Sequence, residues 1–155
     1  MADSTQIGGG GPVSIAGAFT TTGTGTHSGT NTFTGALNLD GKVHYAHETK
    51  TSGALSLGTT ISFLSINSSQ SFSLADGTAE GEVKIVICTV GTSTPVGTLT
   101  PNATAGAYST IEFSGASAVG QSVTLVWTGS GWAIVGRGSG AAAATDAVND
   151  LPVIA

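Results

Sequence analysis

Apolar residues recur at short, strand-like spacing through the second half of the chain. The run Val83-Lys84-Ile85-Val86-Ile87-Cys88 is apolar at nearly every position, which predicts a central strand that is apolar on both faces. Shorter runs follow at 96–100, 110–113, 123–127 and 132–135. Gly129-Ser130-Gly131 separates the last two runs and predicts a tight hairpin between them.

The middle of the chain predicts three further strands, at 42–47, 59–66 and 71–74. The turn signals Asp40-Gly41 and Asp76-Gly77 lie at the boundaries of this region, at the spacing of a meander in which successive strands pair. No segment shows a helical apolar period apart from a weak stretch at 141–148. We therefore expect an all-β fold, an antiparallel β-sandwich or a barrel-like module.

The pattern divides the chain into three parts. Residues 1–37 contain four consecutive glycines followed by Pro12, then a threonine-rich stretch with too few apolar residues to fold alone. We expect an extended Gly/Thr-rich N-terminal arm there, a compact β-rich module over 38–137, and an Ala-rich C-terminal tail over 138–155.

Charge is scarce in this chain. Only 8% of its 155 residues are charged and the formal net charge is -5, whereas a typical soluble domain is about 25% charged. This balance provides no basic surface for nucleic acid or anionic lipid, so we expect neither nucleic acid nor a membrane as a partner. The first residues lack a secretory signal pattern, so we expect synthesis and folding in the cytosol.

Catalytic motifs are incomplete in this sequence. The nearest approach to a nucleophile elbow, Gly115-Ala116-Ser117-Ala118, continues with Val119 where a glycine is required. Gly41-Lys42 lacks the other residues of a phosphate-binding loop. We expect no enzyme, no catalytic residues and no cofactor.

The three histidines do not form a metal motif within one chain. His44 and His47 would point to opposite faces of a strand, and His27 is distant in sequence. A site shared by three chains around an axis is the alternative, but solvated or interface histidines are the favoured interpretation. We therefore predict no metal site.

The remaining reactive side chains also favour structural roles. Asp76, Glu80 and Glu82 flank glycines, and a solvated turn is favoured over a Ca²⁺ site or an acid and base pair. Cys88 is the only cysteine and has apolar neighbours, which predicts a buried, unreactive thiol.

Large apolar residues are the candidates for self-association. Trp127 and Trp132 lie on the two arms of the predicted hairpin, where core or interface packing is favoured over a sugar-binding platform. Phe33 and Leu37 lie at the entry to the compact part. We predict that these four residues take part in contacts between chains, because large side chains anchor interfaces more often than Ser or Thr.

Two stretches resemble segments of bacteriophage virion proteins. Residues 27–37, with the sequence HSGTNTFTGAL, resemble a Ser-Gly-x-Asn-Thr-Phe-Ser-Gly type of segment near the start of phage fibre, spike and head-decoration proteins. Residues 81–136 contain VKIV, TLTP, VTLVW and GWAIVG and are similar to a β module recurrent in phage virion structural proteins. Together the two stretches cover somewhat less than half of the chain.

The resemblance implies a virion structural protein that assembles as an intertwined homotrimer. The short length and the lack of a long repeat favour a capsid decoration, or cement, protein that binds the major capsid protein on the outer surface of the head. A tail fibre or spike subunit that binds a host receptor is the alternative. The expected location is the capsid surface of the virion, after synthesis in the host cytoplasm.

Overall fold

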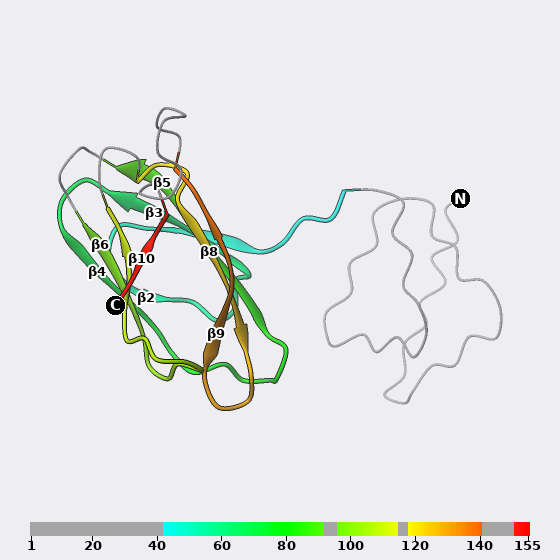
Figure 1. Cartoon of the computed structure of the whole chain (residues 1–155). Helices are drawn as coiled ribbons and strands as arrows, with labels where there is room; N and C mark the ends of the chain where they lie inside the picture. Colours follow the sequence, from blue (N-terminus) through cyan, green and yellow to red (C-terminus); the bar gives the residue numbers. More distant parts are fainter. Residues whose placement is uncertain (1–41, 92–95, 115–117, 141–150) are drawn as a thin grey trace, which may run out of the picture. The chain divides into compact units, whose positions relative to one another are not determined.

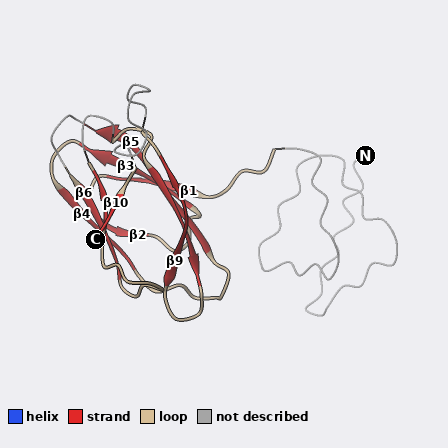
Figure 2. Ribbon diagram, viewed as in Figure 1, coloured by secondary structure: helices blue, strands red, loops and turns tan. Residues whose placement is uncertain are grey.

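The computed structural model describes residues 42–91, 96–114, 118–140 and 151–155 (Figure 1). These residues form strands, turns and loops (Figure 2). No helix occurs among them, and hence none that could cross a membrane. The strands are β1 His47–Lys50, β2 Gly53–Leu55, β3 Ile61–Ile66, β4 Gln70–Leu74, β5 Val83–Gly91, β6 Gly97–Pro101, β7 Ile111–Phe113, β8 Ser122–Trp127, β9 Trp132–Gly138 and β10 Val153–Ile154.

The strands form two mixed sheets of five strands each. Sheet A has the order β1-β3-β5-β8-β9, and sheet B has the order β10-β7-β6-β4-β2. Side chains from both sheets, such as Leu64 and Val86 of sheet A and Phe72 and Leu99 of sheet B, belong to one buried cluster. The all-β prediction is confirmed for the described residues, and the shared core gives the unit a sandwich-like arrangement.

The expectation of antiparallel pairing and of a meander is wrong for the first six strands. These strands alternate between the sheets, β1, β3 and β5 in sheet A and β2, β4 and β6 in sheet B. Neighbours within a sheet are therefore parallel, as in β1 with β3 and β4 with β6. Parallel neighbours need a long connection, which here is a strand of the opposite sheet. Turn residues mark where a strand ends but not which sheet the chain enters next.

The antiparallel pairing predicted for the later strands is found. β5 pairs with β8, and β8 pairs with β9 in a hairpin that places Trp127 opposite Trp132. Gly129 adopts a φ of 87° in the turn, a conformation that glycine adopts without steric cost. The hairpin predicted around Gly129 is therefore confirmed.

Some strand boundaries differ from the prediction. Residues 42–46 are not part of a strand, and the side chains of Val43 and Tyr45 are exposed. Alternation alone suggested a strand there, but pairing begins only at Ala46, whose carbonyl accepts bonds from Thr60 and Ile61. The short strands β2 and β10 were not predicted, because three and two residues are too few to give a periodic signal.

A close approach of two backbones occurs at the start of β9. Ala105 donates a hydrogen bond to the Trp132 carbonyl (2.9 Å), and Trp132 donates to the Ala103 carbonyl (3.0 Å). This pairing lays the chain at Thr104 directly over Gly131. A Cβ at residue 131 would lie 2.5 Å from the Thr104 carbonyl carbon. Only glycine, which has no Cβ, avoids this clash.

The substitution Gly131→Ala should lower the free energy of unfolding by about 1–3 kcal/mol, since the added methyl group meets backbone that cannot move aside. Gly136→Ala on the same strand is the control, because the nearest atom to its Cβ is 3.9 Å away. Urea unfolding of both variants and the parent measures the difference. Equal midpoints for the two variants would contradict this packing.

Candidate functional site

Lys84 is the most unusual residue in the core. It lies on β5 between Val83 and Ile85, and the alternation of the strand turns it to the same side as Val86 and Cys88. Only 1% of its surface is exposed. A buried ammonium group is costly unless its hydrogen bonds are satisfied by the protein.

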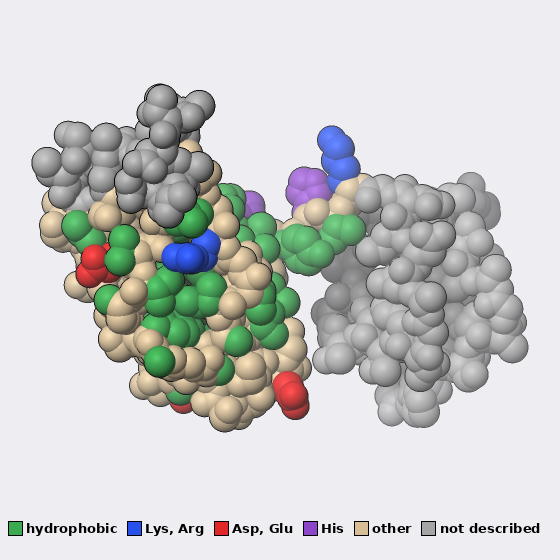
Figure 3. All heavy atoms as spheres, in the orientation of Figure 1, with side chains coloured by type: hydrophobic (Ala, Val, Ile, Leu, Met, Phe, Trp, Pro, Cys, Tyr) green, Lys and Arg blue, Asp and Glu red, His purple; other side chains and the backbone are tan. Residues whose placement is uncertain are grey.

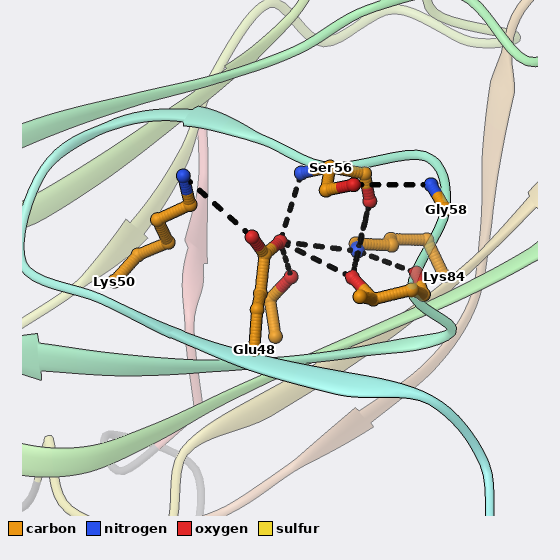
Figure 4. A network of polar contacts seen from close by, with 7 residues as sticks. Glu48, Lys50, Ser56, Gly58 and Lys84 are labelled. Carbon is orange, nitrogen blue, oxygen red and sulfur yellow. Dashed lines mark hydrogen bonds and ion pairs between the residues drawn. The ribbon is translucent and has the colours of Figure 1, made fainter.

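The Lys84 ammonium group is held by the connection between β2 and β3 (Figure 4). Its Nζ donates to the carbonyl oxygens of Ser56 and Thr59, both at 2.7 Å, and lies 3.0 Å from the Thr59 hydroxyl. The Glu48 carboxylate is 3.5 Å away. All the donors of the ammonium group therefore have partners inside the protein.

Glu48 is the centre of the same network. Its Oε1 accepts hydrogen bonds from the Ser62 hydroxyl (2.7 Å) and from the backbone N–H of Ser56 (2.8 Å). Its Oε2 lies 3.6 Å from the ammonium group of Lys50 at the surface. Glu48 thus joins β1 to β3, to the β2–β3 connection and, through Lys84, to β5.

The environment shifts the pKa values of both partners. Burial by itself raises the pKa of Glu48, but the hydrogen bonds from Ser62 and Ser56 and the charge of Lys84 outweigh it and lower the pKa overall. Burial lowers the pKa of Lys84, and attraction to Glu48 offsets only part of this effect.

The geometry of this network supports a structural role. Two backbone carbonyls, a hydroxyl and a carboxylate surround the Lys84 ammonium group. The group is therefore not accessible to a substrate. Its position also explains what sequence analysis missed. A single lysine inside the apolar run of residues 83–88 was a visible signal for a buried ion pair, but its partner could not be identified because Glu48 is 36 residues away.

The two tryptophans that we predicted to take part in contacts between chains lie in the core of the single chain. Trp127 is 6% exposed and Trp132 is fully buried, and their rings pack edge to face with centroids 5.5 Å apart. The Trp132 indole N–H donates to the Ala75 carbonyl (2.8 Å). Their role in contacts between chains stays a prediction, as does that of Phe33 and Leu37, which lie outside the described residues.

The other candidate side chains are dispersed. His47 packs its ring against Phe63 on β3, and His44 precedes β1, so the expected strand geometry of this pair does not occur; His27 lies outside the described residues. Cys88 is buried, and burial raises the pKa of its thiol. No group of three metal-ligating side chains occurs in the part of the chain that the structure describes.

The acidic residues of the turn after β4 bind their neighbours. Asp76 accepts a hydrogen bond from the Asn102 side chain (2.8 Å). Glu82 accepts one from the Thr78 backbone N–H (2.8 Å). The Glu82 bond is local to an exposed turn, whereas the Asp76 bond joins the segment after β4 to the segment after β6.

The two outer faces of the unit differ in chemistry. The outward positions of β3, β5 and β8 in sheet A are mostly apolar and partly exposed. In the register of the sheet, Ile61 pairs with Ile85, Phe63 with Ile87 and Val83 with Val126. We name these six residues and Ala133, which pairs with Val126, the apolar face.

The outer face of sheet B carries hydroxyl groups instead. Ser71 and Ser73 on β4 pair with Thr98 and Thr100 on β6, and none of the four is buried. We name these four residues the hydroxyl face. A shallow depression at the ends of these strands is lined by small and apolar residues, among them Leu74 and Pro101, and by no charged side chain.

Comparison with known proteins adds no relative. No protein-family model matches the chain, and no curated protein matches it.

Replacing Lys84 with Met should lower the free energy of unfolding by about 3–5 kcal/mol, because the Glu48 carboxylate and two loop carbonyls lose their cation. Lys50→Met is the matched control, since Lys50 lies near the same carboxylate but is about one third exposed, and its loss should cost under about 0.5 kcal/mol. Urea unfolding at neutral pH measures both. A similar loss for both variants would show that burial of Lys84 is not what matters.

The Glu48 pKa predicts acid sensitivity. A carboxyl whose pKa is lower in the folded state stabilises the protein above its ordinary value of 4.5, and this contribution is lost as the pH falls through the folded pKa. Glu48→Gln should therefore be less stable than the parent at pH 7, and the difference should shrink below about pH 4. A difference in unfolding free energy that stays constant over this range would contradict the prediction.

Proposed function

We propose that this chain is a structural virion protein, a capsid decoration protein that binds the outer surface of a bacteriophage head and stabilises it. The observation that carries the proposal is where the resembling segments lie. VKIV begins β5, TLTP ends β6, VTLVW lies in β8 and GWAIVG begins at the turn and continues into β9. All four are parts of the same folded β unit, so the resemblance covers a structural module and not scattered turns.

The surface chemistry supports an assembly role. Figure 3 shows apolar and uncharged side chains over most of the coloured surface, with few acidic or basic groups. Such a surface suits contacts made through backbone, hydroxyl groups and small apolar side chains. The proposed partners are the major capsid protein and further copies of this chain in a homotrimer.

The mechanism of stabilisation is binding linkage. A protein that bridges several coat subunits adds binding free energy only to the assembled lattice, and this raises the cost of opening the shell. Threefold symmetry would combine several weak contacts into one stable attachment. The Lys84 network, which holds β1, β3, β5 and the β2–β3 connection together, favours this role. A bridge whose parts are already held in place loses little conformational entropy on binding.

Phage particles that lack this protein should release their DNA at a lower temperature than complete particles, and adding the purified protein back should restore the heat resistance. Release of DNA on heating, followed with a nucleic-acid dye, measures the difference. Equal release temperatures with and without the protein would contradict the proposal. Image reconstruction of the particle gives the location, and density on the tail instead of the head would favour the fibre or spike alternative.

A further inference from the structure

We infer that the apolar face of sheet A is the surface through which copies of this chain associate. The first ground is the contrast between the two outer faces. A sheet with one solvated face normally alternates apolar and polar residues, as β4 and β6 of sheet B do. β3 and β5 do not alternate in this way, since their outward residues are as apolar as their inward ones.

The apolar face is continuous across neighbouring strands. β5 is the central strand of sheet A, and its outward residues Val83, Ile85 and Ile87 have apolar partners on β3 or β8 in the register of the sheet. Val83 is 40% exposed, and Ile85 and Ile87 are partly exposed. A continuous apolar surface of this kind on a soluble β unit marks an interaction site.

The lack of charge on this face favours a second copy of the chain as its occupant. The chain has a net charge of -5, so two copies repel each other at long range, and a contact that brought their acidic side chains together would add to this repulsion. The outward positions of β3, β5 and β8 carry no charged side chain. Two copies can therefore meet here without like-charge repulsion, whereas a basic partner would find no carboxylate to pair with.

The border of the face has the polar character of an interface rim. Thr124 on β8 pairs with Ile85, and Ser122 pairs with Ile87. On the other side, His47 of β1 pairs with Ile61 and packs against Phe63. Aligned β-sheets pack with interdigitated side chains about 10 Å apart, and β-branched residues in a regular register suit that packing.

This interface deepens the self-association part of the proposed function and needs no particular location in a particle. It also differs from the four residues predicted from sequence, since Trp127 and Trp132 have almost no exposed surface. The interface residues are instead cross-strand partners on the adjacent strands β3, β5 and β8.

The test compares single lysine substitutions at the centres of the two outer faces of the full-length chain. Ile85→Lys lies on β5, the central strand of sheet A, and Thr98→Lys lies on β6, the central strand of sheet B. Light scattering coupled to size-exclusion chromatography, over a dilution series, gives the mass of each. We expect the parent and Thr98→Lys to be oligomers and Ile85→Lys to be a monomer with an unchanged β-type circular dichroism spectrum.

A second variant protects the test against misfolding of Ile85→Lys. The double substitution Ile85→Thr and Ile87→Thr keeps β-branched side chains but gives the apolar face the hydroxyl character of sheet B. It should raise the dissociation constant of the oligomer by roughly tenfold or more. A parent chain that is monomeric throughout, or folded variants that associate as the parent does, would overturn the inference.

The outcomes separate this inference from the proposed function. An oligomer that dissociates on Ile85→Lys but is absent from phage heads leaves the interface established and refutes the decoration role. A parent chain that is monomeric but is found on phage heads refutes the interface and supports the proposed location on the head.

Discussion

The chain crosses between the two sheets after each of its first five strands, so neither sheet can be completed without the other. Each parallel pair in sheet A is closed by a strand of sheet B, and each parallel pair in sheet B by a strand of sheet A. The apolar inner faces are therefore buried together, and the folding of the unit depends on contacts between residues distant in sequence. Such topologies fold slowly, because loop closure precedes the gain from pairing.

The Lys84 network reinforces this arrangement at one of the crossings. Ser56 and Thr59 belong to the segment that returns from β2 in sheet B to β3 in sheet A, and their carbonyls are fixed by an ammonium group on β5. Glu48 attaches β1 to the same point. A buried ion pair adds little net stability compared with an apolar core. What it contributes here is a defined position for the crossing, since any other path would leave Lys84 without partners.

Each sheet also has an outer face that is not part of the shared core. Every strand has two sides, and the opposite sheet covers only the inner one. In sheet B the uncovered side is hydroxyl-rich and suits water, whereas in sheet A it is apolar. This asymmetry connects the fold to the proposed assembly, because the unit is complete in its core but retains an apolar surface that a second copy would cover.

The sequence by itself determined the class of the fold and most of the strands. The short apolar or alternating runs at 59–66, 71–74 and 83–88 are local information, and β3, β4 and β5 form where they occur. It also determined that residues 83–88 are apolar towards both sides. Only the tertiary structure decided the sheet to which each strand belongs, the parallel pairing and the partner of Lys84. These depend on where the chain goes after each turn, and the free energy of that choice comes from residues far along the sequence.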